Sequence, residues 1–405
     1  MAAEGADAGF DLAAACCRFP AGEARDVAVA IAARAITDWP RALRILHRHR
    51  IEGLADAALT AARADLPKDV AATLRRRAQA IARYNLAAAA ESVRLQGRLD
   101  AAGIRSLHLK GMALAQLAYG SIAAKFSQDI DILVLPDDAA AAIAVLQDEG
   151  YRLSRPAPRL DARGQRLVLR YGREVELRHA GSGQRVELRW QPVNIPALLG
   201  GVAASSPSQE VLLSETARLR TLRNGDLFAY LCVHGAGHAW SRLQWLADLN
   251  AWMARQDDVA LLRCYQHAEA IGAGTCAALA MLLRQRVLGC APPPATASAV
   301  AHSRAARWAS AMALNVMKSD GSEISAHDRR FHSTQVALLQ LLLGTSLRHY
   351  AGVARDLSFR LDDMLAVPLP APLHVIYPLA RLPLWLWRKM APAPKRAPRD
   401  GVGSA

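Results

Sequence analysis

Apolar positions recur at helical spacing along the N-terminal part of the chain. In residues 42–64 and 72–103, alanine and leucine alternate with arginine every three or four positions, a pattern that predicts helices. Gly103 is expected to end the last of them, because glycine adopts the left-handed conformation that closes many helices. We therefore predict an N-terminal helical region over residues 1–104.

The pattern shifts to shorter elements between residues 105 and 200. Runs with strand character alternate with helical runs, in the order strand, helix, strand, helix, strand, strand. The strand candidates are residues 104–111, 125–136, 166–179 and 184–190, and the helix candidates are residues 112–120 and 137–151. This order predicts an α+β fold whose core, over residues 105–200, is a small mixed sheet with helices on one side.

Helical periodicity returns from Glu210 to about residue 347, which predicts a C-terminal helical region over residues 201–350. Residues 351–405 form a last segment that ends in a proline-rich tail typical of disorder. Within it, residues 373–389 are apolar with a basic end, but an arginine and two prolines interrupt them, so they do not predict a membrane-spanning helix. Two interpretations stay open for this stretch: a segment docked on the protein, or a peripheral contact with a membrane surface.

The composition narrows the class of protein. Hydrophobic residues make up 52% of the chain and aromatic residues only 5%, which favours a helix-rich globular fold over an all-β one. The net charge of +14 favours anionic partners, but nucleic acid is not favoured, because no compact basic run with interleaved aromatics is present. The cysteines form no C-x-x-C pair, and the first 17 residues contain no lysine or arginine. We therefore expect a cytoplasmic protein, with residues 373–389 as a contact with the inner face of the membrane under the second interpretation.

Two aspartates interrupt the apolar strand candidate at residues 125–136. On a strand, residues i and i+2 share a face, so Asp129 and Asp131 point the same way while Ile130 and Ile132 enter the core. Two like carboxylates side by side repel each other unless a cation lies between them. Mg²⁺, or Mn²⁺ in its place, binds carboxylate and phosphate oxygens together and serves phosphoryl transfer. The pair therefore predicts a divalent-metal site.

A third carboxylate usually completes such a site. Glu187, within VELRW, and Glu176, within REVELRH, both lie on later strand candidates with apolar neighbours at alternate positions. Upstream, Gly111 stands where a strand candidate meets a helix candidate, which lets backbone N–H groups approach a phosphate. Lys110 beside it is suited to neutralise phosphate oxygens. These residues predict a phosphate-binding turn followed by two acidic strands.

A second dense group of polar residues lies in the segment HGAGHAWSRLQWLADLN. On a helix, His234 and His238 are i, i+4 neighbours on one face. With Asp248 they form a candidate zinc site, although the glutamate of H-E-x-x-H is absent. A second interpretation assigns the apolar positions of the segment, Trp240 and Trp245 among them, to the core.

Four stretches together resemble a known family. They are LKGMALAQLAYG, KFSQDIDILV, VELRW and HGAGHAWSRLQWLADL. Their order is similar to that of nucleotidyltransferases with the DNA polymerase beta-like fold. More narrowly, they resemble the bacterial family of largely uncharacterised nucleotidyltransferases known as the NTP_transf_5 type. The resemblance spans Arg83 to Asn250 and implies a polymerase-beta-like α+β core flanked by helical regions.

The resemblance also implies roles for individual residues. The catalytic carboxylates, which would also bind Mg²⁺, are Asp129, Asp131 and Glu187. The residues implied in nucleotide binding are Lys110, Gly111, Lys125 and Ser127. The side chains that the later helix would present to the substrate are His234, His238, Arg242 and Asp248.

We therefore predict a Mg²⁺-dependent nucleotidyltransferase that transfers a nucleoside monophosphate from an NTP to an acceptor hydroxyl and releases pyrophosphate. The sequence leaves open the acceptor, the choice of NTP and the oligomeric state. The broader superfamily usually has Gly-Ser or Gly-Gly where this chain has Lys110 and Gly111. This departure motivates one alternative, a binding or regulatory protein that keeps the fold without turnover. The net charge motivates another, a nucleic-acid-modifying nucleotidyltransferase.

Overall fold

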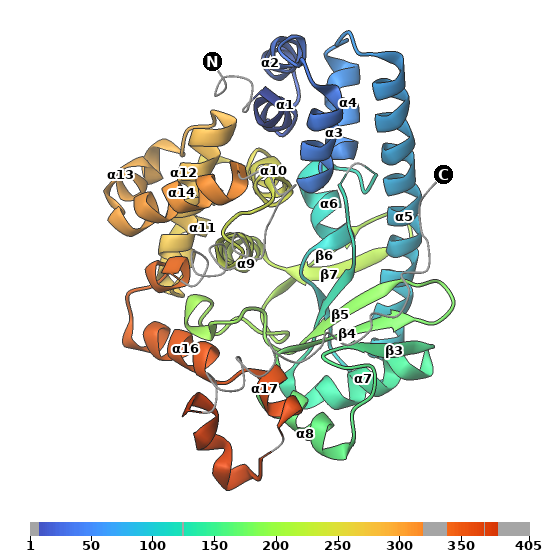
Figure 1. Ribbon diagram of the computed structural model, residues 1–405, viewed down its shortest axis with the longest axis vertical. Coiled ribbons are helices and arrows are strands. Elements are labelled where there is room, and N and C mark those ends of the chain that lie inside the picture. Colours follow the sequence, from blue (N-terminus) through green and yellow to red (C-terminus); the bar gives the residue numbers. More distant parts are fainter. Residues whose placement is uncertain (1–7, 124, 319–337, 368, 380–405) are drawn as a thin grey trace.

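Five helices make up the N-terminal part of the chain that the structure describes (Figure 1). The computed structural model describes residues 8–123, 125–318, 338–367 and 369–379. The helices are α1 (Ala8–Cys16), α2 (Glu23–Arg34), α3 (Trp39–Arg48), α4 (Glu52–Ala61) and α5 (Lys68–Ala101). Gly103 follows α5 with a φ of +72°, a left-handed conformation that glycine adopts without steric cost. The predicted helices and their end at Gly103 are confirmed.

A mixed five-stranded sheet forms the centre of the fold. Its strands are β1 (Leu107–His108), β2 (Ile130–Leu133), β3 (Tyr151–Arg155), β4 (Glu174–His179) and β5 (Arg185–Arg189), in the spatial order β1-β2-β5-β4-β3. Between the early strands lie α6 (Gly111–Tyr119) and α7 (Ala139–Asp148). β2 and β5 run parallel, and the other neighbouring strands run antiparallel. The predicted small mixed sheet within an α+β fold is confirmed.

The two faces of this sheet differ in character. Alternate strand residues such as Ile130, Ile132, Val186 and Leu188 are buried in a hydrophobic cluster with residues of α5 and α7. Each such side chain contributes about 1.5–3 kcal/mol by leaving water. The residues between them point to the opposite face, which carries the acidic side chains. The predicted cover of helices on one side of the sheet is confirmed (Figure 1).

Residues 166–171 form part of a helix, so their prediction as a strand is wrong. This helix, α8 (Ala162–Tyr171), begins after Asp161, whose carboxylate accepts a hydrogen bond from the backbone N–H of Gly164 at 2.6 Å. A short apolar run does not by itself distinguish a strand from a helix. Here the N-terminal cap favours the helix, because it satisfies a backbone donor that the first helical turn leaves free.

A two-stranded hairpin precedes the C-terminal helices, so the prediction of helix from Glu210 onward is wrong for its first residues. β6 (Ser208–Leu212) and β7 (Arg218–Leu222) pair antiparallel. Val211 and Leu219 pack in a small hydrophobic cluster with residues of α6. The alternation of apolar and polar residues in RLRTL is a strand pattern, and α6 supplies the apolar surface that one face of the hairpin covers.

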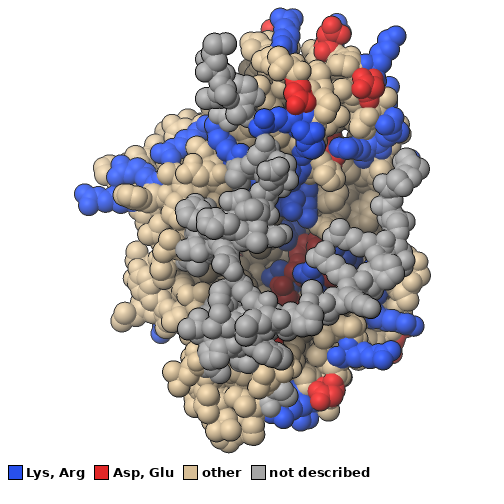
Figure 2. Space-filling model, viewed as in Figure 1, with Lys and Arg blue, Asp and Glu red and all other residues tan. Residues whose placement is uncertain are grey.

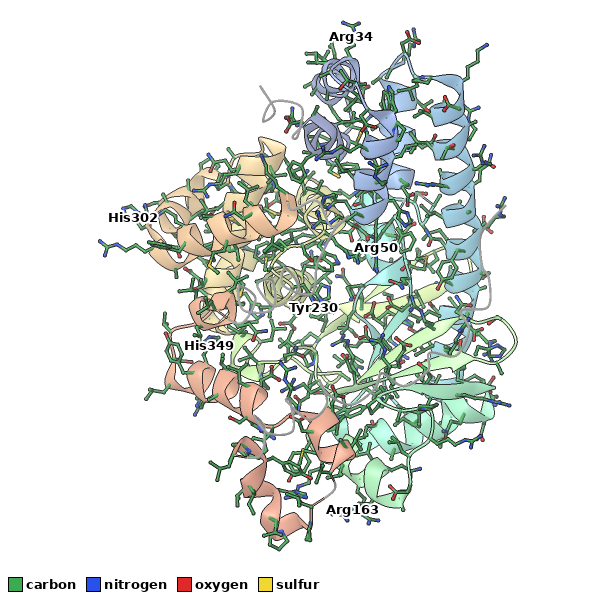
Figure 3. All side chains as sticks on the ribbon, in the orientation of Figure 1. Arg34, Arg50, Arg163, Tyr230, His302 and His349 are labelled. Carbon is green, nitrogen blue, oxygen red and sulfur yellow. The ribbon has the colours of Figure 1, made fainter. Side chains whose placement is uncertain are left out.

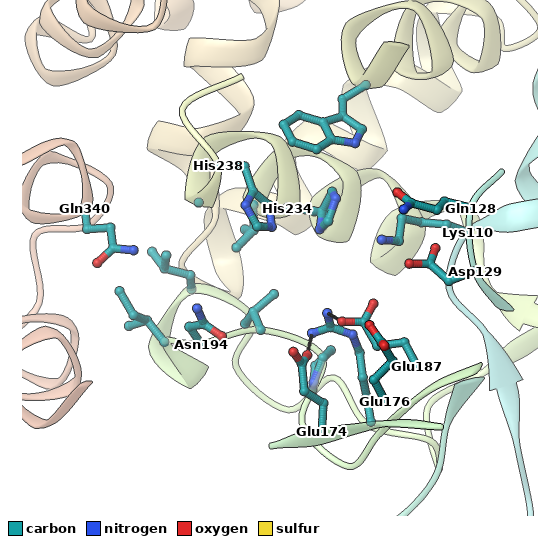
Figure 4. A pocket seen from close by; sticks show the side chains of 18 of the residues that line it. Lys110, Gln128, Asp129, Glu174, Glu176, Glu187, Asn194, His234, His238 and Gln340 are labelled. Carbon is teal, nitrogen blue, oxygen red and sulfur yellow. Dashed lines mark hydrogen bonds and ion pairs between the residues drawn. The ribbon is translucent and has the colours of Figure 1, made fainter. Parts of the chain in front are cut away.

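Further helices follow the hairpin (Figure 1). They are α9 (Asn224–Gly237), α10 (Leu243–Met253), α11 (Asp258–Ala270), α12 (Gly274–Leu288), α13 (Pro294–His302), α14 (Arg304–Lys318) and α16 (Leu347–Ser358). Residues of α1, α4, α9, α10 and α12 belong to one hydrophobic core. The helices before and after the sheet therefore pack on each other. The acidic face of the sheet lies across from α9, one of these helices (Figure 4).

The last described elements dock on the rest of the protein. They are α17 (Leu361–Ala366) and the 3-10 helix η3 (Ala371–Ile376). Tyr377 is only 1% exposed and packs with Met364 and Leu167, which supports a docked start for the stretch 373–389. Residues 380–405 lie outside the described residues. They include the rest of the stretch 373–389 and the predicted tail, so membrane contact stays a prediction. None of the helices in the described ranges combines the length and the apolar character that crossing a bilayer requires.

Candidate active site

The predicted carboxylate residues lie in a row across three strands. Asp131 of β2 is the parallel partner of Glu187 on β5, and Glu187 is the antiparallel partner of Glu176 on β4. Asp129 lies directly before β2, two residues from Asp131 and therefore on the same side. The structure thus brings together, on one face of the sheet, the residues that the sequence pattern singled out.

Asp129, Glu176 and Glu187 of this row line a cavity of about 490 Å³, and Asp131 is buried behind them. Figure 4 shows Lys110, Gln128 and Asp129 on one side of the cavity, with glutamates of β4 and β5 beneath. His234 and His238 lie across from these glutamates, at the C-terminal end of α9. The acidic face of the sheet and the end of α9 therefore form opposite walls of one space.

The turn between β1 and α6 is built around Gly111. This residue has a φ of +62°, and a Cβ atom here would lie 3.6 Å from the hydroxyl oxygen of Ser127. The left-handed backbone disfavours any side chain at this position. Because α6 begins at Gly111, its free N–H groups and partial positive charge lie beside Ser127. Gly111 and Ser127 are thus adjacent, as a phosphate-binding turn requires.

Basic side chains neutralise the acidic row. Lys110 Nζ lies 3.0 Å from Asp131 Oδ1. Arg189 bridges Glu187 and Glu174, with N···O distances of 2.7 and 2.6 Å. Except for Glu174, these side chains are largely shielded from water, and a buried charge that loses its partner is costly. The ion pairs therefore hold the site in a charge-balanced state.

The carboxyl groups differ in their affinity for protons. Burial, followed by the neighbouring Asp131 carboxylate, raises the pKa of Glu187 to about 9. Burial also raises the pKa of Asp129, and Asp131 adds to this effect. Burial acts in the same direction on Asp131, but the Lys110 ammonium and the Arg189 guanidinium outweigh it and lower the pKa of Asp131. Asp131 therefore ionises more readily than Glu187, and Glu187 binds a proton more tightly than Asp131.

The chemistry of these groups suits a hard divalent cation. Asp131 Oδ1 is buried without a well-aligned hydrogen bond, and its neighbour is the cationic end of Lys110. Within the described ranges, no three His, Cys, Asp or Glu side chains stand close enough together to hold a metal ion. Mg²⁺, however, usually takes one or two protein carboxylates and completes its shell with water and substrate phosphates. Asp129 and Asp131 fit that requirement once Lys110 moves away from Asp131.

Comparison with known proteins assigns the family. A family model described as uncharacterised nucleotidyltransferase matches residues 36–289, more than half of the chain. The chain belongs to this family. A search of curated proteins finds no match. The predicted family is confirmed, and nucleotidyl transfer is the general activity that the family indicates.

A wall of aromatic rings closes the nucleotidyltransferase cavity opposite the carboxylates. The ring centroids of His234 and His238 lie 4.8 Å apart, and those of Trp245 lie 5.4 and 5.1 Å from them. Burial, followed by the charge of Lys110, lowers the pKa of His238 to about 4 and also lowers that of His234. Both rings are therefore neutral at pH 7. Since Nε2 of His234 is buried with no hydrogen-bond partner in the described structure, this wall can offer a polar atom to a ligand.

Six predicted site residues of the nucleotidyltransferase are not among the residues that line this cavity. Asp131, Gly111 and Ser127 each adjoin a lining residue, whereas the other three lie further away. Lys125 and Asp248 are buried and form an ion pair with an N···O distance of 3.5 Å. Asp248 also accepts a hydrogen bond from the Tyr119 hydroxyl at 2.7 Å. This pair ties the segment before β2 to α10, so the structure does not support contacts of either residue with nucleotide or substrate, and the zinc interpretation loses its third ligand. Arg242 lines a neighbouring cavity instead.

The nucleotidyltransferase cavity also contains residues that sequence patterns missed. The sequence could have indicated Arg189, because it lies two residues after Glu187 on the same strand, β5, and therefore on the same face of the sheet. The core interpretation of Trp240 and Trp245 is confirmed for Trp240, which is fully buried, whereas Trp245 lines the cavity. Arg50 lies after the end of α3 (Figure 3) and has no local signal, because it reaches the cavity only through the packing of distant segments.

Proposed function

We propose that this protein is a Mg²⁺-dependent nucleotidyltransferase, with Mn²⁺ as the alternative metal. It transfers a nucleoside monophosphate from an NTP to a hydroxyl group of an acceptor and releases pyrophosphate. The observation that carries this proposal is the pairing of Asp131 and Glu187 on parallel strands, with Asp129 two residues earlier. Asp129 and Glu187 line a cavity next to the turn at Gly111, and Asp131 is buried beside them.

The position of each residue supports a role. Asp129, Asp131 and, once its side chain moves closer to them, Glu187 would hold the metal ion, which would supply positive charge next to the oxygens of the reacting phosphate. Lys110 would exchange its contact with Asp131 for a phosphate oxygen, since both are anions within reach of its ammonium group. The N–H groups that begin at Gly111 would bind the remaining phosphates.

The bond changes are those of nucleotidyl transfer. The acceptor oxygen forms a bond with the α-phosphorus, and the bond from the α-phosphorus to the oxygen that bridges to the β-phosphate breaks. The electron pair of that bond leaves with pyrophosphate. The acceptor hydroxyl must lose its proton, and Glu187 is the group that takes it once ionised, because a raised pKa makes a carboxylate a stronger base.

Label transfer tests the proposal. The full-length protein is incubated with Mg²⁺, each α-³²P-labelled NTP and a lysate of its own host, beside an Asp129→Asn/Asp131→Asn variant. We expect a labelled acceptor with the wild type only. Glu176→Gln is the matched control, because Glu176 stands in the same row but its carboxylate accepts a hydrogen bond from Ser154 at 2.6 Å; transfer should persist. Equal labelling by the double aspartate variant would contradict the proposal.

One observation favours a second candidate, a binding or regulatory protein without turnover. Lys110 lies beside Asp131, and Arg189 bridges Glu187 and Glu174, so cationic side chains of the protein already occupy the positions next to the carboxyl groups. A protein of this kind would bind Mg–NTP, or nothing, and yield no labelled product. Equilibrium dialysis of labelled ATP with and without Mg²⁺ distinguishes the two candidates: binding that needs Mg²⁺ and both aspartates, in the absence of any transfer, would favour this second one.

A further inference from the structure

A second cavity adjoins the candidate active site. It has a volume of about 380 Å³, and we call it the arginine cavity; its lining residues include His47, Arg48, Arg50, Phe126, Gln128 and Arg242. Arg50 and Gln128 line both cavities, so the two spaces meet at these side chains. Figure 2 shows Lys and Arg side chains leading from the N-terminal part of the molecule to a central hollow in which acidic side chains are visible.

Two arginine side chains of this cavity, those of Arg50 and Arg242, lack acidic partners in the described part of the chain. Arg50 lies over the ring of Phe126, with its guanidinium carbon 5.3 Å from the ring centroid. Arg242 donates a hydrogen bond to the carbonyl oxygen of Arg48 at 2.8 Å. Neither guanidinium has a carboxylate within ion-pair distance among the described residues. Both are half-buried, so water compensates their charge only in part.

Glu52 also lines this cavity but does not neutralise these arginines. Its Oε1 accepts a hydrogen bond from Arg77 at 2.7 Å, and Nδ1 of His47 lies 3.0 Å from the same oxygen. The carboxylate is therefore already committed to other cations, and the cavity keeps a net positive charge.

A third guanidinium strengthens this charge. Arg185 donates a hydrogen bond to the carbonyl oxygen of Gln128 at 3.4 Å. Burial, followed by the charge of Arg242, lowers the pKa of Arg50 to about 10; the Asp129 carboxylate opposes this shift, and Arg185 adds to it. Mutual repulsion of cations at a shielded site is relieved when an anion binds between them.

Arg50 also occupies a backbone position that favours glycine. It follows α3 with a φ of +57°, and its N–H donates to the carbonyl oxygen of His47 while the N–H of Ile51 donates to that of Leu46. This is a Schellman motif, whose left-handed residue is usually glycine. Arg63 takes the same place after α4, with a φ of +47°, but its side chain is exposed to solvent. Arg63 is therefore a matched control for Arg50.

The arginine cavity lies on a different side of the chain from the phosphate-binding turn. Ser127 is adjacent to Gly111, whereas its sequence neighbours Phe126 and Gln128 line the arginine cavity. An NTP with its phosphates at Gly111 would leave the arginine cavity free. An acceptor whose hydroxyl reaches Asp129 would have this cavity within reach of the rest of the molecule.

We propose that the arginine cavity binds a phosphate group of the acceptor, held by Arg50 and Arg242 with Arg185 nearby. Guanidinium groups match phosphate with paired, charge-assisted hydrogen bonds, and a dianion balances two unpaired arginines better than a carboxylate does. The acceptor is accordingly a small hydroxyl compound that carries a phosphate monoester. The role of its hydroxyl rests on the proposed function, whereas the phosphate site itself does not.

Binding of inorganic phosphate tests the site without any turnover. Equilibrium dialysis with ³²P-phosphate and a metal chelator is carried out on the full-length wild type and on Arg50→Gly, Arg63→Gly and Arg242→Gln. We expect one saturable site in the wild type, binding weakened by about tenfold or more in Arg50→Gly and Arg242→Gln, and no change in Arg63→Gly. Because glycine suits the backbone at 50 and at 63, both glycine variants should melt at or above the wild-type temperature, so lost binding will not reflect unfolding.

Further measurements separate the outcomes. Asp129→Asn/Asp131→Asn should keep its phosphate binding, so the site stands even if nucleotidyl transfer is disproved. The affinity for Mg–ATP should be unchanged in Arg242→Gln, because Arg242 lines the arginine cavity and not the candidate active site. An equal loss of phosphate and Mg–ATP binding in Arg242→Gln would overturn the assignment to the acceptor and place the arginines on the triphosphate. Phosphate binding that is absent from the wild type, or equal in Arg50→Gly, would overturn the site itself.

Discussion

The two adjoining cavities differ in whether their charged side chains have partners of opposite charge. In the candidate active site, Lys110 pairs with Asp131, and Arg189 bridges Glu174 and Glu187, so each of these cations has a carboxyl partner before a ligand arrives. In the arginine cavity, the guanidinium of Arg50 is half-buried over an aromatic ring without a carboxylate partner in the described structure. A balanced site must exchange one cation for another when it binds a metal ion. A site left positive can take up an anion without first breaking an ion pair.

Removing a charge from the balanced cavity should have the largest effect. Asp131→Asn leaves the shielded ammonium of Lys110 beside a neutral amide, which we expect to lower the free energy of unfolding by about 3 kcal/mol. Adding Lys110→Met removes the orphaned charge and should recover most of this loss. Urea denaturation followed by circular dichroism measures both variants. If Asp131→Asn is as stable as the wild type, the Lys110–Asp131 pair contributes little to the free energy of unfolding, and the contrast between the two cavities does not hold.

The proton on Glu187 should make metal binding depend on pH. Burial and the Asp131 carboxylate raise the pKa of Glu187 to about 9, so below this pH the metal must displace a proton. The affinity for Mg²⁺ should therefore rise by about tenfold per pH unit as the pH increases towards that pKa, and level off above it. Calorimetry in buffers of different ionisation enthalpy should detect the released proton. A Glu187→Gln variant should lose this dependence, and a flat pH profile in the wild type would count against Glu187 as a ligand.

Phosphate should stabilise the wild type by a smaller amount. A ligand that binds only the native state adds about 1.4 kcal/mol at ten times its dissociation constant. The melting temperature in phosphate, compared with chloride at the same ionic strength, should rise in the wild type and in Arg63→Gly. It should stay unchanged in Arg50→Gly. If all three proteins respond alike, the effect is a general one of salt, and the arginine cavity is no special site.

The smallest expected change is in the free energy of unfolding of the glycine variants, measured without phosphate. Replacing a residue other than glycine in the left-handed conformation by glycine relieves steric strain, and we expect Arg63→Gly to gain about 1 kcal/mol in the free energy of unfolding. Arg50→Gly should gain less, about 0.5 kcal/mol, because it also loses the contact with the Phe126 ring. Chemical denaturation of the three proteins side by side measures this difference. A marked loss of stability in Arg50→Gly would show that Arg50 supports the fold rather than a ligand.

Local chemistry explains which features could be predicted from the sequence. The shared face of Asp129 and Asp131 follows from strand geometry, and the ends of helices at Gly103 and the turn at Gly111 follow from the freedom of glycine. The mistaken strand at residues 166–171 shows the limit of this reasoning, because a short apolar run fits either element until its cap is known.

Long-range packing explains what could not be predicted. Glu187 and Glu176 have the same local pattern, and only the strand order places Glu187 directly beside Asp131. Arg50 comes from the N-terminal helices and reaches the cavity by tertiary contact alone. Its motif predicts that Lys125 binds the nucleotide, but Lys125 forms an ion pair with Asp248, which lies far along the chain.

The parallel pairing of β2 with β5 has a consequence for how the protein folds. Residues 134–184, with α7, β3, α8 and β4, separate the two strands, so the pairing of Asp131 with Glu187 closes a long loop. Contacts between such distant parts of a chain form slowly, because the entropy of closing the loop must be lost first. A refolding chain should therefore acquire its affinity for metal ions together with the native sheet, and a truncated chain that ends before β5 would have the aspartates but no complete site.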